Sequence, residues 1–440
     1  MPRSSDSSRA TGQVSGQAAV RRAAHSAASD PGVEEASAVS GILPEQPDPF
    51  APDAAWRAAG WRSRLRRSLL RWFQRHGRSL PWRETSDPYL VWISEIMLQQ
   101  TQVATVIPYF ERFRERFPTP AALAAADEEE VLRMWEGLGY YRRARQLHAA
   151  AQQIVSAHQG AFPVDFDAVL ALPGIGRYTA GAILSISQGQ RQPIVEANTQ
   201  RLYSRLLALR LPPAQKEANR LVWEFAAAIL PRKSAGHLNQ AMMDLGALIC
   251  TPRKPQCEAC PLRRLCAAHA HGLEETIPGK VKRIVYEARQ EFALLIREPT
   301  RAAASPAAGP GRYLVYQVPA GRRWAGLWDF PRYGGEQAAT ADEAAYRARQ
   351  DFGLPVELGP HETTIRHGVT RYRITLDAYH ATCETATTRR AAGEPDARAP
   401  ASGQEGAAET LASQWRTPAE LVDLPLNVTG RQLADRLRAR

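Results

Sequence analysis

The chain has 440 residues, of which 44% are hydrophobic and 23% are charged, a balance that is ordinary for a globular protein of two or three domains. Its 56 Lys and Arg against 45 Asp and Glu give a formal net charge of +11, which favours a polyanionic partner. No apolar run reaches the roughly 18 residues of a spanning helix, and the Ser- and Ala-rich N-terminus resembles neither a secretory nor a twin-arginine signal. We therefore expect a cytoplasmic protein that does not bind a membrane.

The first two thirds of the chain divide into a tail and a helical region. Residues 1–55 are rich in Ala, Ser, Pro and Gly and lack a hydrophobic period, which predicts disorder. Residues 56–271 carry apolar residues at helical spacing almost throughout, as in the i, i+4, i+7 set Leu65, Leu69 and Trp72. This region is predicted to be mainly α-helical.

The last third of the chain has a different pattern. Residues 272–288 are predicted to form a connector, and residues 289–440 contain short β-rich runs around one helical segment, 339–354. Inserts rich in Ala, Gly and Pro, near 300–312 and 384–410, are predicted to be mobile loops. We therefore expect a small C-terminal α/β domain.

A single acid, Glu95, interrupts the otherwise uncharged run VWISEIMLQQTQV. Asp87 and Pro88 are suited to the N-cap and first turn of the helix that carries it. Burial among apolar neighbours disfavours the ionised carboxylate, which raises its pKa and makes it a candidate general acid. The alternative is structural, a glutamate paired with a buried arginine or a helix end.

The stretch LPGIGRYTA predicts a tight connection between two helices. Pro173 turns or ends the first helix, Gly174 and Gly176 allow the turn, and a second helix follows from about Arg177. The first N–H groups of that helix would form an anion site. A helix-hairpin-helix that grips a DNA phosphate fits this pattern, although an ordinary helix–helix turn fits the stretch alone about as well.

Four of the five cysteines are spaced C-x6-C-x2-C-x5-C, at Cys250, Cys257, Cys260 and Cys266. Four thiolates this close can hold one zinc ion or one iron–sulfur cubane, and the spacing does not choose between them. The loop also carries several basic residues, which could follow DNA phosphates.

These motifs occur in one order: SEIMLQQTQV, then LPGIGRYTAGAI, then the cysteines. With WEGLGYYRRARQLH and NQAMMDLGALIC, the chain resembles the helix-hairpin-helix DNA glycosylases that carry an iron–sulfur cluster, and among them the MutY family of adenine glycosylases. The resemblance is dense from Leu80 to Cys266 and weaker through GLWDFP to the end. It implies two helical subdomains with DNA bent across their cleft, a [4Fe–4S] cluster on the four cysteines, and a Nudix-like C-terminal domain that checks the lesion.

The resemblance also implies roles for individual residues. Glu95 would protonate adenine at N7, Tyr140 would wedge into the base stack, and Tyr141 would hydrogen-bond in the active site. Further positions match residues that pack around the opposite purine: Gln100, Thr101 and Leu138.

The chain departs from the family pattern at the second carboxylate. The family has Asp-Gly-Asn-Val where this chain has Glu196-Ala197-Asn198-Thr199. Glu196 would stabilise the cationic sugar from a side chain one methylene longer, and Asn198 would orient it. Tyr178 stands where the lyases of the superfamily have their Schiff-base lysine, so we expect a monofunctional glycosylase.

The C-terminal region departs as well. The Phe-Ser-His lesion-sensing loop of the family becomes Val369-Thr370-Arg371, in which Thr370 keeps a hydroxyl and Arg371 replaces the imidazole. Only Asp351 remains of the acidic residues with which a Nudix box holds Mg²⁺, so nucleotide hydrolysis by this domain is not expected.

The partner that the resemblance implies is double-stranded DNA with A:8-oxoguanine or A:G mispairs, bound by a monomer in the nucleoid. Two other functions stay open. One is an oxidised-pyrimidine glycosylase/lyase of the same superfamily, which Tyr178 and the extra domain argue against. The other is a catalytically impaired iron–sulfur DNA-binding protein, in which Glu196 marks lost chemistry.

Overall fold

The structure is a computed structural model that describes residues 54–279, 285–298, 311–335, 337–383 and 411–440. The disorder expected of residues 1–55, and the mobility expected of the two inserts, lie almost entirely outside these ranges. No helix within the described residues has the length and apolar character needed to cross a membrane.

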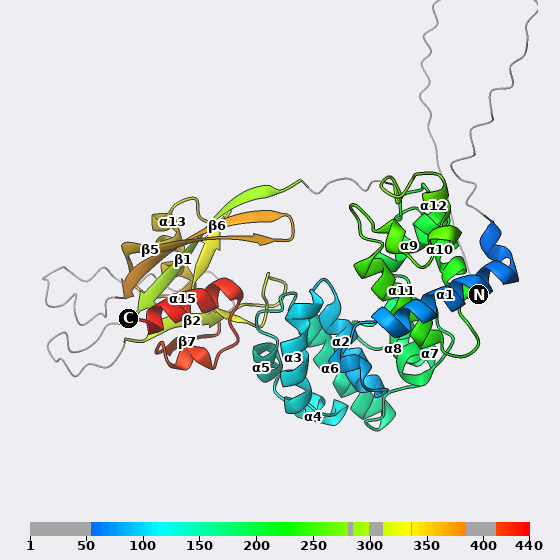
Figure 1. The fold of residues 1–440 in the computed structure, drawn as a ribbon. Helices are drawn as coiled ribbons and strands as arrows, with labels where there is room; N and C mark the ends of the chain where they lie inside the picture. The colour runs from blue at the N-terminus through cyan, green and yellow to red at the C-terminus, as the bar shows by residue number, and fades with distance from the viewer. Residues whose placement is uncertain (1–53, 280–284, 299–310, 336, 384–410) are drawn as a thin grey trace, which may run out of the picture. The chain divides into compact units, whose positions relative to one another are not determined.

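The described part of the chain up to residue 279 is helical (Figure 1), as predicted. Its α-helices are α1 (Ala59–His76), α2 (Pro88–Leu98), α3 (Val103–Arg116), α4 (Pro120–Ala125), α5 (Glu128–Met134), α6 (Arg142–His158), α7 (Phe166–Leu170), α8 (Arg177–Gln188), α9 (Ala197–Leu206), α10 (Lys216–Ile229), α11 (Ala235–Leu248) and α12 (Ala267–Ala270). Single 3₁₀ turns lie at Ala55–Arg57, Pro81–Arg83, Cys257–Ala259 and Arg263–Leu265.

This helical region has two hydrophobic cores, in line with the two subdomains expected. The first is built mainly by α2 to α8 around side chains such as Trp92 and Trp135. The second joins α1 to α9, α10 and α11 around Tyr203 and Phe225. Each large side chain buried in this way contributes about 1.5–3 kcal/mol of transfer free energy. Helix α2, which carries Glu95, therefore belongs to one core, and α9 belongs to the other.

Helix α2 begins as its sequence predicts. The side chain of Asp87 accepts a hydrogen bond from the N–H of Tyr89 at 2.9 Å, and Pro88 occupies the first helical position. Eight of its eleven residues are buried, from Tyr89 to Met97 with Leu90 only partly covered. The helix is thus enclosed on nearly all sides, which explains why its sequence is uncharged except at Glu95.

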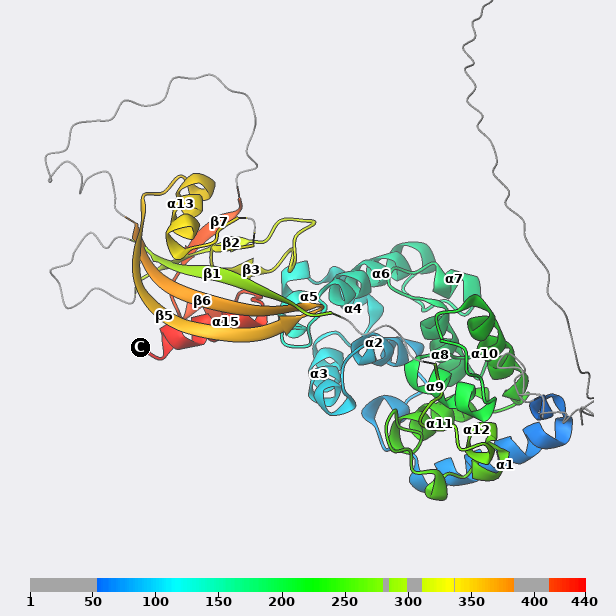
Figure 2. The ribbon, with the colours of Figure 1, turned by 90° about the horizontal axis from the view of Figure 1, so that it is seen from above.

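The C-terminal region is a mixed sheet with one helix on each face, which confirms the α/β prediction. Its strands are β1 (Glu287–Arg297), β2 (Tyr313–Gln317), β3 (Trp328–Asp329), β4 (Arg332–Gly334), β5 (Val356–Val369), β6 (Tyr372–Cys383) and β7 (Ser413–Arg416). The strand order is β3-β2-β1-β6-β5, with β1 and β6 parallel, while β4 pairs with β1 and β7 with β2. Helices α13 (Ala341–Phe352) and α15 (Val428–Arg438) cover opposite faces of the sheet (Figure 2), and a 3₁₀ turn lies at Glu420–Val422.

The sequence does not predict the short strands β3, β4 and β7, nor two longer elements, β5 and α15. Strand β5 is buried at its first residue and otherwise exposed or half-buried, so it lacks a clear apolar alternation. Helix α15 did carry a signal, because Asn427 caps it through the N–H of Gly430 and Leu433 and Leu437 share its buried face. The expected connector 272–288 also contributes structure at both ends: Ile277 is buried, and β1 begins at Glu287.

Candidate functional site

Glu95 lies in the middle of α2 with only 4% of its surface exposed. Burial raises the pKa of its carboxyl to about 7, and the negative charge of Glu196 acts in the same direction. A hydrogen bond from Tyr178 and the positive charge of Arg83 act in the opposite direction without cancelling the effect. A substantial fraction of Glu95 therefore carries a proton at neutral pH, as a general acid requires.

Tyr178 brings helix α8 into this site. Helix α8 starts after the LPGIG turn, with Gly176 as its N-cap, and Tyr178 is its second residue. The Tyr178 hydroxyl donates to Oε2 of Glu95 at 2.7 Å. Burial and the two nearby carboxyl groups raise the pKa of Tyr178 well above its usual value, so the phenol remains a donor. The sequence drew attention to Tyr178 only as a missing lysine, and the contact itself was not foreseen.

Glu196 is the N-cap of α9, where its carboxylate is held by backbone donors. Its two oxygens accept from the N–H groups of Asn198 and Thr199, each at 2.8 Å. The Thr199 hydroxyl accepts from the Glu196 N–H at 2.8 Å, which completes a reciprocal capping box. The longer side chain of glutamate is thus folded back onto its own helix and fixed there.

Asn198 connects this carboxylate to the cysteine loop. Its amide nitrogen lies 3.2 Å from Oε2 of Glu196, and its Oδ1 accepts from Arg201 at 3.0 Å. Arg201 in turn donates to the carbonyl of Cys250 at 2.8 Å. The orientation of Asn198 therefore depends, through Arg201, on the position of Cys250 at the start of the cysteine loop.

A cavity opens beside Glu95. Arg83 and Arg78 lie at its wall, and both donate to the buried carboxylate of Asp244, with the shortest contacts at 2.8 and 2.5 Å. The remaining lining residues are mostly apolar or neutral: Leu80, Trp82, Val91, Ser94, Leu98, Val103, Ile186, Gln240 and Met243. A protonatable acid and two anchored arginines thus border a small cavity whose other walls are uncharged.

Two loops next to this site carry Tyr140, which is expected to wedge into the base stack, and the residues expected to pack around the opposite purine. Tyr140 is 51% exposed and has a positive φ of 50°, while Leu138 beside it is buried. Gln100 is exposed on the other loop, with a φ of 58°, and Thr101 follows it half-buried. An exposed ring on a strained loop is available for insertion, whereas Leu138 is available only in part.

Tyr141 lies in the wall of the large cleft that Tyr140 also lines. The ring is buried, and its hydroxyl lies 3.4 Å from both the Gly137 N–H, from which it accepts, and the Leu426 carbonyl, to which it donates. The carboxyl of Glu95 is instead bonded by Tyr178. Tyr141 thus supports the loop that carries Tyr140.

A large cleft joins most of the remaining predicted residues. Gln100, Tyr140, Gly174, Gly176 and Thr370 all line it. Its described lining also contains six arginines and no acidic residue: Arg142, Arg143, Arg145, Arg322, Arg323 and Arg366. This charge fits a polyanion such as a nucleic-acid backbone.

Arg371 does not line this cleft. It sits at the tip of the β5–β6 hairpin and pairs with Glu287 at 3.1 Å. Thr370 precedes it with a positive φ of 51°, an unusual conformation for a β-branched residue. The hairpin therefore contributes the threonine to the cleft and directs the arginine to Glu287 instead.

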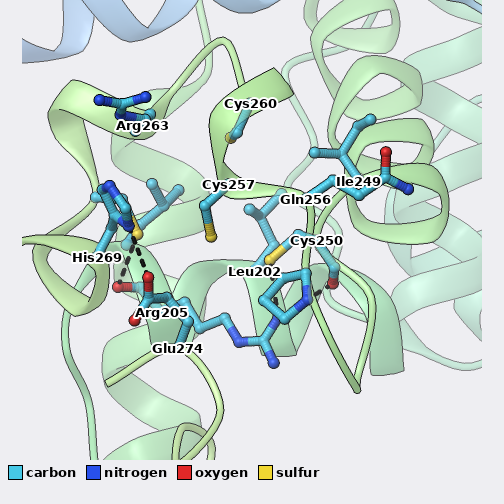
Figure 3. A pocket seen from close by; sticks show the side chains of 13 residues that line it. Leu202, Arg205, Ile249, Cys250, Gln256, Cys257, Cys260, Arg263, His269 and Glu274 are labelled. Carbon is cyan, nitrogen blue, oxygen red and sulfur yellow. Dashed lines mark hydrogen bonds and ion pairs between the residues drawn. The ribbon is translucent and has the colours of Figure 1, made fainter. Parts of the chain in front are cut away.

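The four cysteines of the spacing pattern converge on one cavity in the loop after α11 (Figure 3). None of them forms a disulfide, and burial together with the charges of the other cysteines raises the pKa of Cys260 to about 12 and that of Cys266 to about 11. Arg205, buried beneath, donates to the sulfur of Cys250 at 3.2 Å. Four thiolates around one cavity would repel one another, and the cationic iron–sulfur core of a cluster would offset that repulsion.

Three family models match the chain. The HhH-GPD superfamily base excision DNA repair protein matches residues 93–228, the iron–sulfur binding domain of endonuclease III matches residues 250–266, and the NUDIX domain matches residues 305–436. The second match favours iron over zinc: residues 250–266, which contain the four cysteines, match an iron–sulfur binding domain, as the resemblance implied.

Similar proteins include the adenine DNA glycosylase of Rattus norvegicus, which is 34% identical over 73% of this chain and 71% of its own length. The adenine DNA glycosylase of Buchnera aphidicola subsp. Schizaphis graminum is 41% identical over 52% of this chain and 66% of its own length. Among solved structures, a thermostable thymine-DNA glycosylase is 28% identical with a TM-score of 0.44, covering 48% of this chain and 98% of that protein.

Proposed function

The chain belongs to the adenine DNA glycosylase family, and from this premise we propose that it removes adenine mispaired with 8-oxoguanine or guanine in double-stranded DNA. The enzyme is a base excision repair glycosylase with an iron–sulfur cluster. The observation that carries the proposal is the buried Glu95, whose carboxyl has a pKa of about 7 and borders an apolar cavity.

Glu95 acts as the general acid in this proposal. With adenine turned out of the duplex into the cavity, the protonated carboxyl donates its proton to N7. The bond between N9 and C1′ of the sugar then breaks, and its electron pair moves into the base. General-acid catalysis of this kind contributes about 10²–10⁴ in rate.

Glu196 acts on the other side of the breaking bond. Its carboxylate stabilises the oxocarbenium-like sugar until water adds at C1′ and gives a proton back to the ionised Glu95. Asn198 keeps the Glu196 carboxylate oriented. A carboxylate misplaced by roughly 1 Å can cost about 10²-fold. The capping box supports activity despite the change from aspartate, because it fixes the longer side chain through two N–H donors.

Tyr178 makes the reaction monofunctional. A lyase needs a nucleophilic amine at this position to form a Schiff base with the sugar, and a phenol that donates to Glu95 does not supply one. The product is an intact strand with an abasic site. The exposed and half-buried arginines of the large cleft would hold the phosphates, and the first turn of α8 would hold one more.

The test measures adenine release from duplexes with A opposite 8-oxoguanine, G or T, and strand breaks before and after alkali. We expect release opposite 8-oxoguanine and G, with breaks only after alkali, and Glu95→Gln should bind the same duplex without releasing adenine. Breaks without alkali would favour a lyase. Binding by the native protein without release would favour the impaired DNA-binding protein.

A further inference from the structure

One buried arginine connects the two loops that border the large cleft. Arg143 lies in the first turn of α6 and is only 8% exposed. Burial lowers the pKa of its guanidinium to about 10, so the group stays charged near neutral pH. Such a buried cation is tolerated only where acceptors surround it.

The two terminal nitrogens of Arg143 serve different loops. Nη1 donates to the carbonyls at the end of α2: Ile96 at 2.8 Å, Met97 at 3.0 Å and Gln99. Nη2 donates to Leu138 at 3.3 Å and Gly139 at 3.2 Å, and to the Thr101 hydroxyl at 3.2 Å. One planar group thus holds the loop after α2 and the loop before α6 at a fixed separation.

Both loops carry strained backbone at their exposed residue. Gln100 and Tyr140 have positive φ angles of 58° and 50°, conformations that cost free energy for residues other than glycine. Such conformations persist only where the surrounding structure holds them. The hydrogen bonds of Arg143 fall on Gln99 and Thr101 around the first strained residue, and on Gly139 next to the second.

We propose that Arg143 is a positioning residue that sets Gln100 and Tyr140 in register, so that both loops enter the duplex at the mispair as one preorganised unit. The proposal rests on the proposed function, because it concerns how the mispair is recognised. The preference for mispaired over paired DNA then depends on the guanidinium of Arg143. The general affinity for DNA phosphates depends on the other arginines of the cleft.

The Arg143→Lys variant distinguishes this role from simple capping of α2. It keeps the charge and can cap the carbonyls of α2, but the single nitrogen of lysine cannot span both loops. Arg142 is the matched control, since it is exposed and adjacent, and Arg142→Lys removes a guanidinium fork while leaving both loops tethered.

The experiment measures the dissociation constants of native protein, Arg143→Lys and Arg142→Lys for a duplex with a non-hydrolysable adenosine analogue opposite 8-oxoguanine, and for a fully paired duplex. A 2-aminopurine beside the lesion reports insertion of Tyr140 through its fluorescence. We expect Arg143→Lys to lose mispair affinity by on the order of tenfold to a hundredfold, with a weaker fluorescence change, unchanged affinity for paired DNA and an unchanged pH profile of adenine release. Arg142→Lys should keep the native ratio of mispair to paired-DNA affinity, because any change at this exposed arginine acts on phosphate contacts that both duplexes share.

Three results would overturn the proposal. If Arg143→Lys keeps the native affinity for the mispair, the two loops do not need the guanidinium to hold their positions. Equal loss of mispair and paired-DNA affinity, with a lower Tm, means that Arg143 only stabilises the fold. A native protein that releases no adenine and prefers no mispair removes the proposed function, and the positioning role with it.

Discussion

Replacing Tyr178 with phenylalanine tests whether the protonation of Glu95 controls the reaction. The Tyr178 hydroxyl donates to Glu95 at 2.7 Å and lowers the pKa of the carboxyl, because a hydrogen bond to the ionised form stabilises it. Removing the hydroxyl leaves burial and the charge of Glu196, which both raise the pKa. The pKa of Glu95 should therefore move upward from its present value of about 7.

The size of the change follows from the strength of the lost bond. A hydrogen bond to a charged group contributes about 1.5–3 kcal/mol, which corresponds to about 1–2 pKa units. The general acid acts only when protonated, so adenine release by the native enzyme should fall above pH of about 7. In Tyr178→Phe the same fall should begin about 1–2 pH units higher.

The assay is single-turnover adenine release from an A:8-oxoguanine duplex at saturating enzyme, followed across the pH range. Tyr203→Phe is the matched control, because Tyr203 is also buried near Glu196 but has no hydrogen bond to Glu95 among the described contacts. An alkaline limb that stays in place or moves to lower pH in Tyr178→Phe would refute the reasoning.

Three further predictions follow from the same structure. Glu196→Gln should reduce adenine release by on the order of a hundredfold while changing the free energy of unfolding by only about 1 kcal/mol, which release kinetics and thermal denaturation measure together. Cys260→Ser should lose the visible absorption of the iron–sulfur cluster and weaken DNA binding, since the cavity then lacks one thiolate; full absorption in that variant would contradict the ligand assignment. Asp244→Asn should lower the stability at neutral pH by about 3–5 kcal/mol. Burial raises the pKa of Asp244, but the hydrogen bonds from Arg83 and Arg78 outweigh burial and lower the pKa below 3.8. The ionised Asp244 therefore stabilises the native protein above that pH, and this stabilisation is lost as the pH falls through the folded-state pKa. The difference in the free energy of unfolding between the native protein and Asp244→Asn should therefore narrow in acid. A difference that stays constant with pH would argue against this role of Asp244.

The parts of the site that the sequence predicts are those set by local rules. The Asp87 cap, the burial of Glu95 and the turn at Gly174 each depend on neighbours a few residues away, and the structure contains all three. The cysteine spacing likewise brings the four cysteines together at short range, although the spacing alone did not choose between iron and zinc.

The parts that the sequence does not predict depend on contacts between distant helices. Tyr178 and Glu95 are 83 positions apart, and nothing in either stretch indicates their hydrogen bond. Arg143 resembles its exposed neighbours in WEGLGYYRRARQLH, yet its guanidinium is buried because the carbonyls at the end of α2 face it. Long-range packing decides which arginine of such a run becomes buried.

The capping box of Glu196 is an intermediate case. Glu196 and Thr199 have the spacing of a helix N-terminus, so a cap could have been predicted from residues alone. The sequence instead drew attention to the departure from the family aspartate. In the structure the Glu196 carboxylate caps α9, and the same carboxylate must also serve the proposed catalytic role.

The most direct test of the central claim is single-turnover adenine release from an A:8-oxoguanine duplex by the native enzyme, with Glu196→Asp measured beside it. We expect fast release by the native enzyme, because a substantial fraction of Glu95 is protonated and the Glu196 carboxylate is fixed by its helix end. No release by the native enzyme, with release recovered in Glu196→Asp, would contradict it and show that mispair recognition persists in a protein whose chemistry has lapsed.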